Sequence, residues 1–312
     1  MKYRKIGNTD LEVSAIALGS WVFGGEGWGK EADDDESVRV IGRALDMNIN
    51  FIDTAPIYGD GRAETVIGKA IQGKRKDVII ATKCGLEKKG RSIKCNLTAK
   101  FIREEIENSL RRLNVETIDL YQCHWPDKDT PFEETFGELN KIKEEGKIRY
   151  IGVSNFEKEL LEEAVSIAPV VSDQVRYSVF DRGIEKELIP FCGRKEISIL
   201  SYGSLGGGIL TGKYKEPPVF EKSDVRSFFY RYYKEPFWSN GRAAISNLEN
   251  IASERNVPTA QIAINWVLSR KEVAGCIIGC RTEQQLMSNI GAVNWELTPE
   301  ELATLTGPVP NV

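Results

Sequence analysis

The 312-residue sequence contains very little histidine and no paired cysteines. His124 is its single histidine. The cysteines are scattered without CxxC spacing, at Cys84, Cys95, Cys123, Cys192, Cys276 and Cys280. Because zinc sites are built mainly from histidine and cysteine ligands, we expect no metal centre. Because disulfide frameworks are typical of oxidising compartments, we expect these cysteines to be reduced thiols.

The chain also lacks a surplus of positive charge and a membrane-length apolar run. Its net charge is −4 and its pI is near 5.5, which gives no electrostatic attraction to nucleic acid or to an anionic membrane. Residues 1–19 carry basic side chains but no apolar signal-peptide core, and no later run approaches the roughly 20 residues of a membrane-spanning helix. We therefore expect a cytoplasmic protein without nucleic-acid or membrane partners, and the oligomeric state stays open.

Strand-like and helix-like segments alternate along the whole chain. Short β-branched runs cover residues 14–18, 50–53, 78–83, 118–124, 148–154, 172–177, 198–202 and 275–279. Segments of helical period lie between them, for example residues 36–47, 98–113, 132–145 and 158–167. This alternation predicts an α/β fold with roughly eight βα units, a (β/α)8 TIM barrel that forms a single domain over residues 1–312. An open doubly wound sheet is the alternative, because alternation does not show closure.

Several helix starts carry the pattern of a capping box, a Ser or Thr followed three residues later by Glu or Gln. The pairs are Thr130 with Glu133, Ser154 with Glu157, Thr282 with Gln285, and Thr298 with Glu301.

One aromatic and arginine-rich segment, residues 213–241, follows the seventh strand-like run. Arginine interleaved with aromatic residues can bind single-stranded nucleic acid. The acidic chain and the position of the segment favour instead a lid over a cofactor or substrate. Phe228, Phe229 and Trp238 are candidates without assigned roles.

Polar residues end consecutive strand-like runs: Asp53 the second, Lys83 the third and His124 the fourth. Tyr58 follows Asp53 by five residues. In a barrel, the carboxyl ends of the strands meet at one rim, so an acid, a phenol, an ammonium and an imidazole are expected to converge there. Taken singly, His124 could be a structural group and Lys83 a mere ion-pair partner of Asp53.

These four side chains can act together in acid catalysis. A phenol with a pKa near 10 is a poor acid at neutral pH, and a neighbouring ammonium is expected to lower the pKa of Tyr58. Asp53 would hold Lys83 charged and in place. Tyr58 then serves as general acid toward a developing alkoxide, while a neutral His124 donates a hydrogen bond to the carbonyl oxygen.

Six motifs follow one another along nearly the whole chain: DTAPIYGDGRAE, IIATK, IDLYQCHWPD, GKIRYIGVSNF, LSYGSLGGGILTGKY and IIGCRTEQQLMSNIGA. In this order and at this spacing they resemble the aldo-keto reductases. The resemblance is closest to the bacterial branch that includes general stress and inositol-operon reductases. It implies reversible, NADPH-dependent reduction of aldehydes or ketones to alcohols, with Asp53, Tyr58, Lys83 and His124 as the catalytic tetrad.

The resemblance also implies a binding set for NADP(H). The set is Ser20, Trp21, Asp53, Ser154, Asn155, Gln174, Tyr202, Gly203, Ser204, Leu205, Gly206, Gly208, Lys213, Gly279, Arg281, Gln285 and Asn289. Ser154, Asn155 and Gln174 would bind the carboxamide of the nicotinamide, and Tyr202 would stack on its ring. The glycines that follow Tyr202 would let the pyrophosphate approach the backbone closely. Arg281 would hold a 2′-phosphate, which favours NADPH over NADH. A basic residue that relatives often have near Gly207 is absent, so Arg281 and Lys213 would carry more of that role.

The substrate pocket implied by the same motifs is aromatic and apolar, with Trp21, Tyr58, His124 and Trp125. Such a mouth suits aromatic or medium-chain aldehydes better than highly charged sugars. The alternative from a different functional class is a cofactor-binding, redox-sensing regulatory or scaffold protein of the same fold, in which turnover is incidental.

Overall fold

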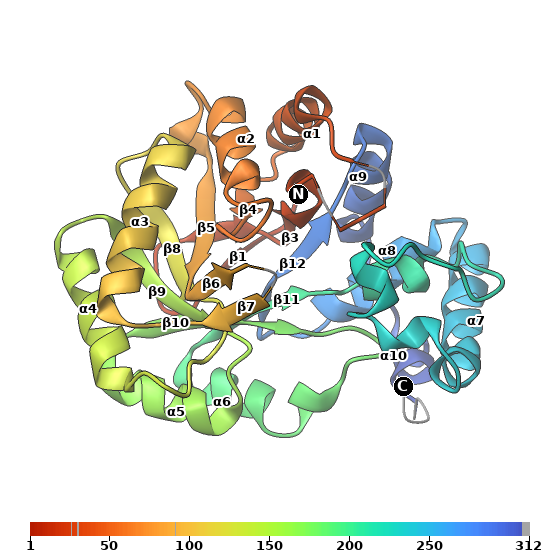
Figure 1. Ribbon diagram of the computed structural model, residues 1–312. Coiled ribbons are helices and arrows are strands. Elements are labelled where there is room, and N and C mark those ends of the chain that lie inside the picture. Colours follow the sequence, from red (N-terminus) through yellow and green to blue (C-terminus); the bar gives the residue numbers. More distant parts are fainter. Residues whose placement is uncertain (26, 30, 91, 308–312) are drawn as a thin grey trace.

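A closed barrel of parallel strands forms the centre of the molecule in the computed structural model, which describes residues 1–25, 27–29, 31–90 and 92–307 (Figure 1). In chain order the barrel strands are β3 (Ile16–Gly19), β4 (Phe51–Asp53), β5 (Ile79–Cys84), β8 (Ile118–Cys123), β9 (Ile148–Ser154), β10 (Val170–Arg176), β11 (Ser198–Tyr202) and β12 (Val273–Gly279). Strand β12 pairs in parallel with β3, with Cys276 opposite Ile16. This pairing closes the sheet, so the predicted (β/α)8 barrel is confirmed and the open doubly wound alternative is wrong.

Helices surround the barrel (Figure 1). They are α1 (Asp34–Asp46), α2 (Arg62–Ala70), α3 (Ala99–Leu113), α4 (Phe132–Glu144), α5 (Lys158–Ile167), α6 (Leu188–Lys195), α7 (Phe237–Arg255), α8 (Thr259–Leu268), α9 (Glu283–Ile290) and α10 (Pro299–Thr306). Each long helix turns an apolar stripe inward; α3, for example, buries Ile102, Ile106 and Leu113, which recur at helical spacing. Within the described part of the chain, no helix combines the length and apolarity needed to span a membrane.

The helix starts confirm only part of the predicted capping. Thr298 and Glu301 form a full capping box at α10, and Thr282 caps α9 by accepting from the Gln285 N–H. The other two predicted boxes are wrong. The Thr130 hydroxyl donates to Asp127 instead of capping α4, and the Ser154 hydroxyl donates to a carbonyl of β10 instead of capping α5.

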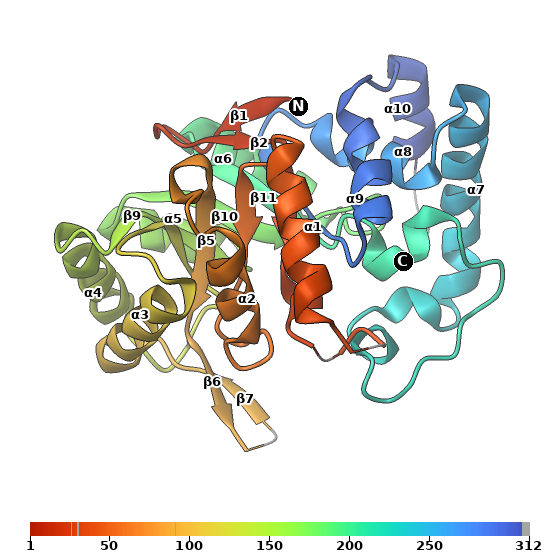
Figure 2. The same cartoon turned by 90° about the horizontal axis from the view of Figure 1, so that it is seen from above.

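Two antiparallel hairpins, which the sequence did not predict, lie at opposite ends of the barrel (Figure 2). One joins β1 (Tyr3–Lys5) to β2 (Glu12–Ser14), and the other joins β6 (Leu86–Lys89) to β7 (Ser92–Cys95). Ile6 and Leu11 of the first hairpin pack with Phe51, Leu120 and Leu200 from inside the barrel. The amino-terminal hairpin therefore plugs the end of the barrel at which the strands begin.

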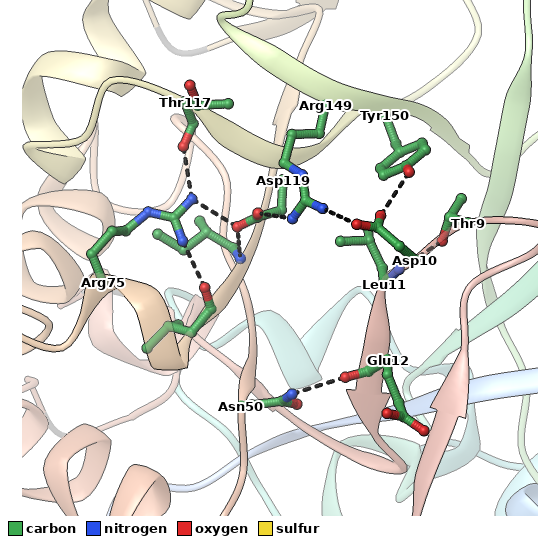
Figure 3. Close-up of polar contacts among 12 residues, drawn as sticks. Thr9, Asp10, Leu11, Glu12, Asn50, Arg75, Thr117, Asp119, Arg149 and Tyr150 are labelled. Carbon is green, nitrogen blue, oxygen red and sulfur yellow. Dashed lines mark hydrogen bonds and ion pairs between the residues drawn. The ribbon is translucent and has the colours of Figure 1, made fainter.

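Ion pairs tie this plug to the barrel (Figure 3). Asp119, near the start of β8, is buried and accepts from Arg75 Nη2 and Arg149 Nη1, both at 2.8 Å. Arg149 Nη2 also donates to Asp10 in the hairpin at 2.7 Å, and the Tyr150 hydroxyl donates to the same carboxylate at 2.7 Å. These contacts are structural, because catalytic sites of such barrels lie at the opposite end.

The segment expected to form a lid folds into short 3-10 turns beside α7 and α8 (Figure 1). They are η5 (Val225–Ser227) and η6 (Arg231–Tyr233), and a further 3-10 turn, η4 (Gly206–Thr211), precedes the segment. Helix α7 already begins at Phe237, and Trp238 is buried in it. The irregular segment therefore ends at residue 236 rather than at residue 241.

Candidate active site

A buried ion pair lies at the centre of the carboxyl end of the barrel. Asp53 ends β4, and Lys83 projects from the adjacent strand β5 with a side-chain exposure of 0%, against 4% for Asp53. Lys83 Nζ donates to both Asp53 carboxylate oxygens, at 2.7 and 2.8 Å, and to the Thr54 carbonyl at 2.9 Å. These contacts use all three N–H donors of the ammonium. Burial lowers the pKa of Lys83, and the Asp53 carboxylate opposes that shift.

Tyr58 lies above this pair, in the loop that follows β4. Its ring centroid is 5.4 Å from Lys83 Nζ and 5.9 Å from the His124 ring, which meets it edge-on. The expectation that the pKa of this phenol lies below its ordinary value is wrong. Burial, followed by the Asp53 carboxylate, raises the pKa of Tyr58 well above 10, and the ammonium directs its hydrogen bonds elsewhere. The phenol therefore stays protonated over the whole neutral range.

His124 immediately follows β8 and is buried. Its backbone N–H donates to the Cys84 carbonyl at 2.9 Å, and its own carbonyl accepts from Asn155 Nδ2 at 3.0 Å. Burial, reinforced by the Lys83 charge, lowers the pKa of His124 well below 6.5. The imidazole is therefore neutral at physiological pH, as predicted, and retains one N–H donor.

Side chains from β9, β10 and β11 form a continuous chain of hydrogen bonds along the rim. The Tyr202 hydroxyl donates to Asn155 Oδ1 at 2.7 Å, and Asn155 Nδ2 donates to Ser154 Oγ at 2.9 Å. Ser154 Oγ donates to the Gln174 carbonyl at 2.7 Å. Gln174 Nε2 then donates to Asp53 Oδ1 at 2.6 Å. The structure thus brings the residues expected to bind nicotinamide together with the buried ion pair.

A glycine-rich turn follows β11. Gly206, Gly207 and Gly208 have φ values of 58°, 66° and 106°, a backbone region that favours glycine. A Cβ at Gly207 would lie 2.8 Å from the Tyr230 ring, and one at Gly208 would lie 3.3 Å from Lys213 Nζ. The turn therefore exposes backbone next to one lysine.

Three further residues of the predicted cofactor set lie just before this turn. Gly203 has a positive φ of 67°, Leu205 is half-buried, and the Ser204 hydroxyl is hydrogen-bonded to the Ser201 hydroxyl at 2.7 Å.

The last predicted cofactor group lies at β12 and α9. Arg281 Nη1 donates to the Trp28 carbonyl at 2.8 Å, so this arginine bridges to the loop that follows β3. Gln285 Oε1 accepts from the Arg281 backbone N–H at 2.8 Å, and Asn289 is buried against Cys280. Gly279 is exposed at the end of β12.

Aromatic rings cover the tyrosine. Trp21 stacks on Tyr58 with a centroid distance of 5.7 Å and an interplanar angle of 13°. Trp28 and Phe229 each meet Trp21 edge-on, at 5.2 and 5.4 Å. Trp125 stands at the rim with 39% exposure. Trp28 was not predicted from the sequence as a site residue; it lies between Gly27 and Gly29 in the loop that follows β3, where glycines at a strand-to-helix connection are the available signal.

Comparison with known proteins identifies the family. The model of the aldo/keto reductase family matches residues 15–308. The chain belongs to the aldo/keto reductase family. The chain is 38% identical to the aldo-keto reductase YhdN of Bacillus subtilis over 96% of this chain and 91% of that protein. It is 32% identical to the NADH-specific methylglyoxal reductase of Escherichia coli over 98% of this chain and 97% of that protein.

Among solved structures, the glycerol dehydrogenase AKR11B4 from Gluconobacter oxydans is similar to this chain with a TM-score of 0.88 and 36% identity, over 99% of this chain and 98% of that chain. Aldo/keto reductases are oxidoreductases that act on carbonyl groups with a nicotinamide cofactor, and membership makes this chain such an enzyme. The regulatory alternative is not favoured.

The residues of this aldo/keto reductase fit a nicotinamide dinucleotide. Ser20 Oγ and Trp28 Nε1 are buried at the loop after β3, and neither has a hydrogen-bond partner among the described residues. Unpaired buried polar atoms are costly, so both are suited to a polar ligand. The glycine turn, with Lys213 beside Gly208, provides the backbone approach and the positive charge that phosphate groups require.

Proposed function

We propose that this enzyme reduces aldehydes or ketones to alcohols with NADPH, with Tyr58 as the general acid. The observation that carries the proposal is the convergence of a protonated phenol, a neutral imidazole and a buried Lys83–Asp53 pair at one mouth of the barrel. A bound nicotinamide supplies the hydride that reduces the carbonyl carbon. The protein's own residues orient the substrate and deliver the proton.

Tyr58 suits this role even though burial raises its pKa. A carbonyl oxygen whose carbon gains a hydride becomes an alkoxide, which is a far stronger base than a phenolate. Proton transfer from the phenol to the alkoxide is therefore still favourable. Lys83, 5.4 Å from the ring centroid, stabilises the phenolate that results, and Asp53 keeps the lysine charged.

His124 and Trp21 would define where the carbonyl oxygen sits. A neutral imidazole donates one hydrogen bond without competing as a proton source. The ring of Trp21, stacked on Tyr58, excludes water from one side of the phenol. With Trp125 at the rim, this mouth suits aromatic or medium-chain aldehydes.

The preference for NADPH over NADH rests on Arg281 and Lys213, the cations assigned to the phosphate-binding set. An arginine fork recognises phosphate by paired hydrogen bonds. Because the methylglyoxal reductase of Escherichia coli is named NADH-specific, the preference needs its own test. If the assignment is right, Arg281→Met weakens NADPH binding about 10-fold or more but changes NADH binding little, and equal losses for both cofactors would contradict it.

Residues 213–236 would serve as a lid over the cofactor and substrate. Two contacts support this role: the Val225 N–H donates to the Gly27 carbonyl at 2.7 Å, and Phe229 meets Trp21 edge-on. Both contacts connect the segment after β11 to the loop after β3, across the mouth of the barrel.

A single-turnover reaction tests the proposed function. The purified enzyme, stoichiometric NADPH and a reactive aromatic aldehyde are mixed, and the loss of reduced-nicotinamide absorbance is followed. We expect oxidation within seconds for the wild type. Tyr58→Phe should retain NADPH binding and react about 10²- to 10⁴-fold more slowly, the usual contribution of a general acid. Tyr121→Phe, which removes a buried hydroxyl outside the group, is the matched control.

Near-normal turnover by Tyr58→Phe would reject the assigned acid. Tight NADPH binding without any oxidation by the wild type would reject the proposed reaction, and absence of NADPH binding would reject the cofactor assignment.

A further inference from the structure

Arg176 is a cation at the mouth of the barrel to which the catalytic scheme gives no role. It ends β10 two residues after Gln174, and it lies opposite Tyr202 of β11 in the strand register. Alternation along the strand places it on the same inner face as Gln174, one step nearer the rim. Its side chain is partly buried, and its Cγ would lie 3.4 Å from a Cβ at Gly203, beside the glycine turn.

Aromatic rings surround this guanidinium. Its Cζ lies 4.3 Å from the ring centroid of Phe229, 5.5 Å from that of Tyr230 and 5.9 Å from that of Tyr202. Phe229 in turn meets Trp21, and Trp21 stacks on Tyr58. The guanidinium is therefore separated from the phenol by two aromatic rings and faces the same mouth.

No carboxylate of the described residues lies within ion-pair distance of Arg176. Two other partly buried arginines have such partners, since Arg226 pairs with Asp224 and Arg270 with Glu185, whereas the partly buried Arg4 donates to backbone carbonyls instead. Asp181 is an acidic neighbour of Arg176, but its carboxylate accepts from the hydroxyls of Ser178 and Tyr232. A half-buried cation held by rings and lacking an anionic partner is the arrangement expected of an anion-binding side chain.

We propose that Arg176 binds a carboxylate or phosphate group at the barrel mouth, and this inference rests on the proposed function. The group could belong to the substrate or to the pyrophosphate of the cofactor, since both place the same oxygen chemistry near the glycine turn. On the substrate side, the preferred carbonyl compound carries an anionic group several bonds away from the carbonyl carbon, because Trp21 and Phe229 separate Arg176 from Tyr58. Among the aromatic or medium-chain aldehydes predicted from the sequence, this selects those that carry an acidic group.

Two aldehydes that differ in one charge test the proposal: 4-carboxybenzaldehyde and its methyl ester. Their kcat/KM values are measured for the wild type, Arg176→Met and Arg176→Lys, and the Kd for NADPH is measured by fluorescence titration. Arg111→Met, which removes an exposed arginine on α3, is the charge-matched control. Urea unfolding of each variant checks that the fold is retained.

If the anion belongs to the substrate, Arg176→Met loses about 10- to 100-fold in kcat/KM for the acid, the effect expected for hydrogen bonds to a charged group. The ester and the Kd for NADPH change little, and Arg176→Lys retains part of the preference for the acid. If the anion belongs to the cofactor, the Kd for NADPH rises about 10-fold or more and both aldehydes are affected equally.

An Arg176→Met variant that matches Arg111→Met in both aldehydes and in NADPH binding would overturn the proposal. Failure of the proposed function gives a different result, because the wild type would then reduce neither aldehyde. In that case the Kd values of the two aldehydes and of NADPH for wild type and Arg176→Met still decide whether Arg176 binds an anion.

Discussion

Removing either partner of the Lys83–Asp53 pair is expected to destabilise the fold strongly. Asp53 accepts two hydrogen bonds from Lys83 and one from Gln174, and both charged side chains are almost completely buried. Lys83→Met removes the counter-charge and two of those three bonds. Breaking a buried ion pair on one side typically costs about 3–5 kcal/mol, and we expect a loss of that size in the free energy of unfolding.

Asp53→Asn should show a cost that depends on pH. Burial already lowers the pKa of Lys83, and loss of the carboxylate lowers it further. The folded variant therefore binds fewer protons at Lys83 than the unfolded chain, whose lysine pKa is about 10.4, so stability rises with pH by up to about 1.4 kcal/mol per unit below that value. The destabilisation relative to wild type should shrink from pH 6 to pH 9.

The double variant Asp53→Asn with Lys83→Met completes the cycle. It buries no charge at this place, so its free energy of unfolding should lie within about 2 kcal/mol of that of the wild type. This loss is much smaller than the sum of the losses in the two single variants. Urea unfolding followed by tryptophan fluorescence measures all four proteins. If each single variant loses less than about 1 kcal/mol in the free energy of unfolding, and the double variant loses the sum of the two, the side chains are not a charged, coupled pair.

Two further predictions concern single residues. His124, as the sole histidine, gives one imidazole NMR signal, and the titration midpoint of that signal should lie well below 6.5. Because its pKa is lower in the folded than in the unfolded chain, stability should fall as the pH drops below about 6.5. A midpoint near 6.5 would contradict this environment. Gly207→Ala should cost about 1–2 kcal/mol of stability and also weaken NADPH binding, because its φ is 66° and a Cβ would strike the Tyr230 ring. Gly146→Ala is the control, because Gly146 has a φ of 76° and open space around it; this variant should lose stability through backbone strain but bind NADPH normally. Equal NADPH binding by the two variants would argue against a role for the glycine turn in cofactor binding.

The barrel and the central group could be predicted because each depends on short-range signals. Every barrel strand was visible as a β-branched run, and Asp53, Lys83 and His124 stand at or next to the ends of β4, β5 and β8. The topology of a parallel barrel then brings them together without further information.

Features that depend on side-chain direction could not be predicted. The three donors of Lys83 go to Asp53 and Thr54, so the expected lowering of the Tyr58 pKa fails, and no sequence pattern reports that choice. Ser154 fits a capping box in sequence, yet it ends β9 and α5 begins only at Lys158, so its hydroxyl donates to the Gln174 carbonyl of β10 instead. The environment of Arg176 is equally hidden, since two of its three rings come from the irregular segment.

The pairing of β12 with β3 also bears on how the protein emerges from the ribosome. Strand β3 is made among the first 20 residues, whereas its neighbour β12 is not complete until residue 279. Until then, one edge of β3 lacks its partner, and one edge of β11 does so as well from the point at which residue 202 has been added. Unpaired strand edges invite pairing with other chains, so the nascent polypeptide is most exposed to aggregation just before its last barrel strand is released.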